Sequence, residues 1–198
     1  VEEGMYPSWI SGTSAGSMVA ALYACGYNPC EMENIALTLN KSIYDIDFPG
    51  IFFGILKWVI TGETNWDGLI KGRKIELLMK KLTHGKYINE TNIPLAITAV
   101  DINTGNTIMF VSNKKKLNDE RDVVYVDDIP IYKAVRASIA IPVILKPIIV
   151  KGIKLVDGGV TDIVPSNVLR KMGAHKVIGI NLGYSGQRRN DINNILEI

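Results

Sequence analysis

The stretch W-I-S-G-T-S-A-G-S-M-V-A-A-L-Y runs from Trp9 to Tyr23 and decides how the chain is read. It opens on an apolar pair, passes through a run of small residues, and continues into residues that favour a helix. After Ala15, apolar side chains recur at helical spacing as far as Gly26. The stretch therefore predicts a short buried strand at Trp9–Ile10, then a tight turn, then a helix.

The turn in this stretch fits the pattern G-x-S-x-G, from Gly12 to Gly16. Between a strand and a helix, that pattern is typical of a nucleophile elbow, in which the serine is lifted off the edge of the sheet. Small flanking residues are expected because strand and helix pass close together there. The pattern predicts Ser14 as a nucleophile and the Ala15 N–H, at the positive end of the helix, as an oxyanion donor. A plain helix start with Ser or Thr capping is the alternative.

A serine nucleophile needs a neighbouring base, which in the usual triad is a histidine oriented by an acid. The chain has two histidines. His84 lies in a polar turn after a predicted helix, and His175 lies where a predicted strand begins, and both are ordinary places for a surface imidazole. Both stay open as the base, because adjacency in space is not visible in a sequence.

Carboxylates are the other candidates for the base. Asp157 ends a predicted strand and is followed by Gly158 and Gly159, which leave the space in front of it clear. Catalytic sites of α/β proteins assemble at strand ends, although an Asp-Gly pair is also a common turn. Asp162 is a rival nearby, whereas Asp101 is explained as a turn residue of D-I-N-T-G.

The rest of the chain alternates helical and strand-like segments. The apolar pattern predicts helices at Lys71–Leu82, Ile131–Ser138 and Val164–Met172, and strands at Ile93–Asp101, Thr107–Val111 and 176–182. With 198 residues, 47% of them hydrophobic, the chain suits one domain spanning 1–198. Such alternation indicates an α/β layered fold with a mostly parallel sheet.

Composition excludes several classes of function. Lys and Arg number 22 against 20 Asp and Glu, and this near balance argues against nucleic acid as a partner. Cys25 and Cys30 are too few for a disulfide scaffold, and no metal-ligand set completes a zinc site, so we expect reduced thiols and a cytoplasmic protein. No signal peptide is visible. The longest apolar run, Phe48–Ile60, is shorter than the ~20 residues of a spanning helix.

That apolar run lies in a mixed segment, 41–68, which is expected to form a cap or a loop with short helices. It suits an acyl pocket, a peripheral contact with a membrane surface, or a buried cap helix. If Phe52, Phe53 and Trp58 meet lipid, polar replacements are expected to weaken vesicle binding and spare hydrolysis of a soluble short-chain ester.

Four motifs occur along the chain. They are the elbow with its helix, A-V-D-I-N-T-G from Ala99, V-R-A-S-I-A-I-P from Val135, and V-D-G-G-V-T-D-I-V-P with the following G-A-H-K-V-I-G-I-N-L. Together they resemble the patatin-like phospholipases, in the bacterial branch of that family of serine lipid acyl hydrolases. They occur in the family's order and cover most of the chain, whereas 41–68 is the least family-like part.

The resemblance implies a three-layer fold and a Ser–Asp dyad without a catalytic histidine. Ser14 would be the nucleophile and Asp157 the base, acting through an acyl-enzyme on fatty acyl esters of phospholipids or lysophospholipids, with no cofactor. A free Asp has a pKa near ~4, too low for a good base, and a desolvated site would raise it. The alternatives are a non-catalytic binding or regulatory relative and a soluble triad esterase that uses a histidine.

One family feature is not found in the chain. The family has a glycine-rich loop upstream of the elbow that supplies further oxyanion donors, and a first strand beside it. Here V-E-E-G at the start reads as a helix ending on Gly4, so we expect both to precede Val1. Without that loop, residues 1–198 are expected to hydrolyse esters at least ~100-fold more slowly than the complete protein.

Overall fold

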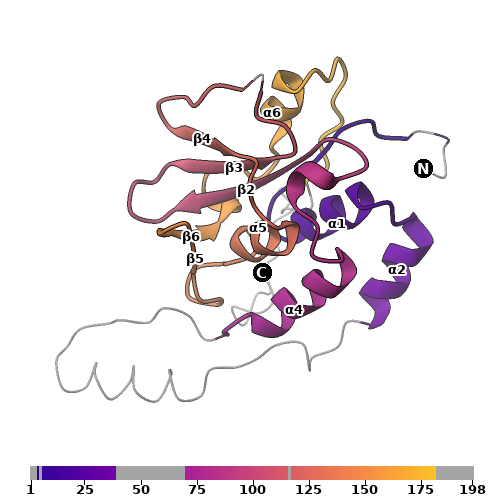
Figure 1. The fold of residues 1–198 in the computed structure, drawn as a ribbon, viewed down its shortest axis with the longest axis horizontal. Coiled ribbons are helices and arrows are strands. Elements are labelled where there is room, and N and C mark those ends of the chain that lie inside the picture. Colours follow the sequence, from indigo (N-terminus) through magenta and orange to yellow (C-terminus); the bar gives the residue numbers. More distant parts are fainter. Residues whose placement is uncertain (1–3, 5, 39–69, 116, 182–198) are drawn as a thin grey trace, which may run out of the picture.

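The computed structural model describes residues 4, 6–38, 70–115 and 117–181, drawn in colour in Figure 1. The segment 41–68, with its apolar run, lies outside the described residues. The elements are β1 (Ile10–Gly12), α1 (Ala15–Ala24), α2 (Pro29–Thr38), α4 (Arg73–Leu82), the 3₁₀ turn Ile88–Glu90, β2 (Leu95–Asp101), β3 (Thr107–Val111), β4 (Val123–Val126), α5 (Ile131–Ser138), β5 (Ile148–Val150), β6 (Ile153–Asp157), the 3₁₀ turn Gly158–Val160 and α6 (Ser166–Lys171).

Strand β2 is the centre of the sheet, and every one of its residues is buried. The strand order is β4-β3-β2-β6-β5, and β1 also pairs with β2. Because β3 occupies one edge of β2, β1 and β6 share the other edge: β1 pairs with Leu95–Ile97 in parallel, and β6 pairs with Ala99–Asp101 antiparallel. The carboxyl ends of β1 and β6 therefore face each other across Thr98.

An α/β fold with a central sheet flanked by helices is confirmed, but the described strands form a mixed sheet rather than a mostly parallel one. Only β1–β2 and β3–β4 are parallel among the described pairs, and the other three are antiparallel. The reason is the length of the connections. Short turns join β2 to β3 and β5 to β6, and a short turn can join only antiparallel neighbours.

The two faces of the sheet pack against different helices. Leu95 and Ile97 of β2 lie in one core with residues of α1, α4 and α5. Ala96, between them, faces the opposite way and lies in a second core with Val168 and Leu169 of α6. Alternate side chains of a strand point to opposite faces, so β2 contributes to both cores. Figure 1 shows the resulting layers, with α6 across the sheet from α1, α4 and α5.

The predicted buried strand at 176–182 is wrong for the residues that the structure describes, which end at 181. No strand is formed there, and the side chains of Ile178 and Ile180 are 66% and 77% exposed. An apolar run becomes a strand only where a neighbouring strand takes its backbone N–H and C=O groups. None of the described strands pairs with this segment.

Gly158 allows the carboxyl end of β6 to lie against β2, and this contact gives a testable prediction. A Cβ on Gly158 would lie 2.4 Å from the Thr98 carbonyl oxygen. Gly158→Ala is therefore expected to lower the free energy of unfolding by at least ~2 kcal/mol, because backbone cannot yield as a flexible side chain does. Urea unfolding followed by circular dichroism measures this loss.

Gly16 provides the matched control, because a Cβ there would meet nothing within 4 Å and the residue lies in α1. Gly16→Ala is expected to be neutral or to stabilise by up to ~1 kcal/mol through helix propensity. Equal stability of the two variants would show that the contact at Gly158 is not tight.

Candidate active site

The elbow predicted from the sequence has the strained backbone that such a turn requires. Ser14 lies between β1 and α1 with φ 54° and ψ −128°, in the left-handed half of the map. A residue other than glycine in this region of the map has a strained backbone, which destabilises the folded state. Such strain is characteristic of functional sites. The Ser14 N–H donates to Ser138 Oγ at 2.9 Å, so α5 helps to hold this conformation.

The two glycines of the elbow differ in what they allow. A Cβ on Gly12 would lie 2.3 Å from the Gly16 carbonyl oxygen, so the close approach of strand and helix requires glycine at Gly12. A Cβ on Gly16 would meet no atom within 4 Å. The expectation that both flanking positions must be small is therefore correct for Gly12 and wrong for Gly16, where a side chain would have room.

Two side-chain hydrogen bonds tie the elbow to the segment that follows β6. Ser11 Oγ donates to the Pro165 carbonyl, and Thr13 Oγ1 donates to the Asp162 carbonyl, both at 2.9 Å. These contacts join parts of the chain about 150 residues apart. They fix the elbow relative to the end of β6, where Asp157 lies.

Asp157 is buried at the carboxyl end of β6, with only 5% of the residue exposed. Its N–H donates to the Ala140 carbonyl at 3.0 Å, and its Oδ1 accepts the Gly159 N–H at 2.7 Å. Burial raises the pKa of Asp157, while the neighbouring Ser14 hydroxyl and the Gly159 N–H act in the opposite direction.

The structure thus brings Ser14 and Asp157 together. The other carboxylate oxygen, Oδ2, is buried and has no hydrogen-bond partner among the described residues. The Ser14 hydroxyl is close enough to lower the pKa of Asp157, although its geometry is not that of a well-formed hydrogen bond to Oδ2. Catalytic hydrogen bonds are often long before substrate binds.

The other candidate bases lie elsewhere. His84 is exposed in the turn after α4, with φ 52°, and His175 is exposed after α6. Asp101 accepts from the Asn103 N–H and the Thr104 hydroxyl within its own turn. None of these three is hydrogen-bonded to Ser14 in the part of the chain that the structure describes.

Asp162, the remaining rival, also has a pKa raised by burial, which the Val164 N–H opposes. Its backbone carbonyl accepts from Thr13 Oγ1. Asp162 therefore contacts the elbow through its backbone, and its described side-chain partner is Val164 rather than Ser14.

The backbone N–H groups around Ser14 leave one donor available. The Ser14 N–H is used by Ser138, the Gly16 N–H donates to the Thr13 carbonyl, and the Ser17 N–H donates to the Ser14 carbonyl. Among the described residues, the Ala15 N–H has no acceptor. It lies at the amino end of α1, where the helix dipole favours negative charge, and it suits the oxyanion role predicted for it.

Ser138 is the site residue that sequence reasoning missed. It is fully buried at the last position of α5, and it lies in the V-R-A-S-I-A-I-P motif. A buried serine on an otherwise apolar helix face is the only signal that could have pointed to it, because a buried hydroxyl needs a partner. The partner, 124 positions earlier in the chain, is visible only in the fold.

No helix of the described residues has the length and apolar character needed to cross a membrane.

Comparison with known proteins gives the family. The family model of the patatin-like phospholipases matches residues 1–169. The chain is 28% identical to the uncharacterized protein YqhO of Bacillus subtilis (strain 168), over all of this chain and 69% of that protein. It is 27% identical to the lysophospholipase NTE1 of Scheffersomyces stipitis, over 90% of this chain and 10% of that protein.

A third relative is the uncharacterized NTE family protein Rv1063c of Mycobacterium tuberculosis, 25% identical over 89% of this chain and 41% of that protein. The chain thus spans about two thirds of YqhO and smaller shares of the other two. The family model covers the elbow, the strand that ends in Asp157, and most of α6. On this evidence, the chain belongs to the patatin-like phospholipase family.

Proposed function

We propose that this protein is a serine acyl hydrolase that cleaves fatty acyl esters of lipids through Ser14 and Asp157. The family and the lysophospholipase name of the NTE1 relative support lipid hydrolysis. The proximity of Ser14 to a buried carboxylate supports the dyad. Phospholipids or lysophospholipids are the proposed substrates.

The observation that carries the mechanism is the state of the two Asp157 oxygens. Oδ1 accepts the Gly159 N–H at 2.7 Å. Oδ2 is buried and has no partner among the described residues. A buried oxygen without a hydrogen bond has a strong tendency to accept a proton. The neighbouring Ser14 hydroxyl is the group that can supply it.

In the proposed reaction, Asp157 Oδ2 takes the proton of Ser14 as Ser14 Oγ forms a bond to the ester carbonyl carbon. The negative charge that develops on the carbonyl oxygen faces the Ala15 N–H. The carbon–oxygen bond to the alcohol then breaks, and the alcohol leaves with the proton from Asp157. Water next attacks the acyl carbon while Asp157 accepts one proton of that water. The bond between this carbon and Ser14 Oγ then breaks, Asp157 passes the proton from water to Ser14 Oγ, and the fatty acid is released.

A fluorophosphonate probe tests the proposal directly. In the complete protein, the probe is expected to label one peptide, with the adduct on Ser14, as located by mass spectrometry. The labelling is expected to disappear in Ser14→Ala. Persistent labelling in that variant, or an adduct on another residue, would contradict the assignment.

The pH dependence of the reaction provides a second test. Asp157 must be deprotonated to act as a base, so kcat/KM is expected to fall as the pH drops through its pKa. Because burial raises that pKa, the acid limb should lie above the value of a free Asp, about 3.9. A pH profile with a soluble ester measures it. If kcat/KM instead falls near pH ~6.5, and this pH changes in His84→Ala or His175→Ala, the base is a histidine.

A further inference from the structure

The motif V-R-A-S-I-A-I-P begins in the last turns of α5 and takes no part in the proposed reaction. Two of its residues, Ser138 and Ala140, are completely buried, with 0% of each exposed. Ser138 Oγ accepts the Ser14 N–H at 2.9 Å. The Ala140 carbonyl accepts the Asp157 N–H at 3.0 Å. The three residues 138–140 therefore contact the backbone of both members of the proposed dyad.

The strained backbone of Ser14, with φ 54° and ψ −128°, needs contacts that hold it. Such strain persists only where the surrounding structure determines the conformation. The Ser14 carbonyl accepts from the Ser17 N–H at 2.9 Å and from Ser17 Oγ at 2.6 Å, both within the first turn of α1. The hydrogen bond from the Ser14 N–H to Ser138 is different, because it reaches another helix, 124 positions away. Ser138 therefore holds this turn relative to the rest of the fold.

The two serines that contact the Ser14 backbone differ in how far they can be replaced. Without the Ser17 hydroxyl, the Ser14 carbonyl would keep the Ser17 N–H. The Ser14 N–H has Ser138 Oγ as its acceptor and no second acceptor among the described residues. An N–H that loses its acceptor destabilises the conformation that strands it. Loss of the Ser138 hydroxyl would therefore let the turn relax.

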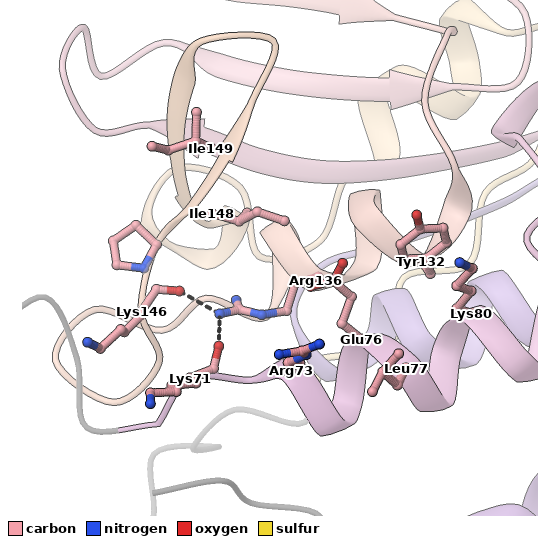
Figure 2. Close-up of a pocket in the computed structure, with 11 residues that line it drawn as sticks. Lys71, Arg73, Glu76, Leu77, Lys80, Tyr132, Arg136, Lys146, Ile148 and Ile149 are labelled. Carbon is pink, nitrogen blue, oxygen red and sulfur yellow. Dashed lines mark hydrogen bonds between the residues drawn. The ribbon is translucent and has the colours of Figure 1, made fainter. Parts of the chain in front are cut away.

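Helix α5 is itself fixed by Arg136, on a different side from Ser138. Arg136 is 3% exposed, and one of its terminal nitrogens donates to the Lys71 and Lys146 carbonyls, both at 2.7 Å, as Figure 2 shows. A Cβ on Gly72 would lie 2.5 Å from Arg136 Nε, so the guanidinium packs tightly against this turn. Residues two positions apart point to different sides of a helix. Arg136 thus ties α5 to the segments before α4 and β5, and Ser138 ties it to the elbow.

We propose that Ser138 is a positioning residue for the hydrolysis, which acts by holding Ser14 in line with Asp157. Because Ser138 is completely buried, it acts through Ser14 and does not contact the substrate. The turn that it holds carries the nucleophile and the Ala15 N–H, and both must be in fixed positions for the reaction. The inference rests on the proposed function, in which Ser14 is the nucleophile.

Ser138→Ala in the complete protein tests the proposal, with a soluble short-chain ester as substrate. We expect kcat to fall ~10–100-fold, because a small displacement of a catalytic group can cost about that much. KM should stay within ~3-fold, because no contact with the substrate is lost. The rate constant for labelling of Ser14 by a fluorophosphonate should fall with kcat. An unchanged kcat would overturn the proposal.

Ser17→Ala is the matched control, because Ser17 is also completely buried and also hydrogen-bonded to the Ser14 backbone. It is expected to keep kcat within ~3-fold, since the Ser14 carbonyl keeps another donor. A loss of kcat in Ser17→Ala as large as that in Ser138→Ala would mean that any buried hydroxyl near the elbow has this effect, and it would overturn the specific role of Ser138.

Thr83→Val controls for a loss of stability. Thr83 is completely buried at the end of α4, its hydroxyl donates to the Met79 carbonyl, and it is not part of the elbow. The variant is expected to lower Tm, as Ser138→Ala does, because each loses one buried hydrogen bond. Its kcat should not change. Equal losses of kcat in Thr83→Val and Ser138→Ala would show that Ser138 acts only on stability, which would overturn the proposal.

Hydrogen exchange of the Ser14 N–H, followed by NMR, tests the contact without relying on catalysis. In Ser138→Ala this N–H is expected to exchange at least ~10-fold faster, while the N–H groups of β2 keep their rates. Unchanged exchange at Ser14 would overturn the proposal. If the unaltered protein neither hydrolyses esters nor is labelled at Ser14, the proposed function fails. Faster exchange in Ser138→Ala would then still show that Ser138 holds the turn.

Discussion

Replacing Ser14 with alanine is expected to lower turnover of a lipid ester by ~10⁴-fold or more, the scale of loss when a serine nucleophile is removed. The reason is that Ser14 Oγ forms the acyl-enzyme, and no described neighbour can replace it. Release of fatty acid from a lysophospholipid by the complete protein provides the measurement. Thermal unfolding should change little, because the hydroxyl has no ordinary hydrogen bond whose loss would be felt.

Ser166→Ala is the control for this experiment, because Ser166 is the first residue of α6 and is not part of the elbow. It is expected to keep full activity. Substantial activity in Ser14→Ala would mean that the chain hydrolyses esters by another route. If both the unaltered protein and the variant are inactive and the probe does not label Ser14, the protein is a non-catalytic relative.

Replacing Asp157 with asparagine is expected to lower turnover by ~10²–10⁴-fold, the usual contribution of a general base. Asparagine keeps the shape and can still accept the Gly159 N–H, but it cannot take the proton of Ser14. His84→Ala and His175→Ala are the controls, and both should keep nearly full turnover. Asp162→Asn tests the neighbouring carboxylate in the same way. An active Asp157→Asn beside an inactive histidine variant would contradict the dyad.

The same substitution has an unusual expected effect on stability. Burial raises the pKa of Asp157, so the folded protein holds this proton more tightly than the unfolded chain does. The resulting stabilisation is complete below the unfolded pKa, about 3.9, and is lost as the pH rises through the raised folded pKa. At neutral pH the buried carboxylate is destabilising. Asp157→Asn should therefore raise Tm or leave it unchanged, whereas a merely structural Asp would lower it.

The sequence by itself determined the local features of this protein. The elbow was readable because a strained turn between a strand and a helix allows few residue types, and Gly12 meets the Gly16 backbone there. The bounds predicted for Thr107–Val111 and Ile131–Ser138 are confirmed. Such features depend on backbone sterics and on the period of the apolar pattern, which act over a few residues.

Asp157 is an intermediate case. Its place at a strand end could be predicted, but the residues alone left His84, His175 and Asp162 open, and only the family resemblance selected it. The fold supplies the physical reason for its position. Because β1 and β6 share one edge of β2 and run toward each other, their carboxyl ends meet across Thr98.

Only the tertiary structure decided the features that depend on segments far apart. The mixed sheet follows from which strands pair. The missing strand at 176–181 follows from the lack of a described partner. Ser138 reaches Ser14 across 124 positions, and Arg136 of α5 donates to the carbonyls of Lys71 and Lys146, which lie 65 and 10 positions away. Each of these features depends on a contact, or on the lack of one, with a residue far away in the sequence. No local pattern specifies such a partner, because strand pairing and burial depend on how the whole chain folds.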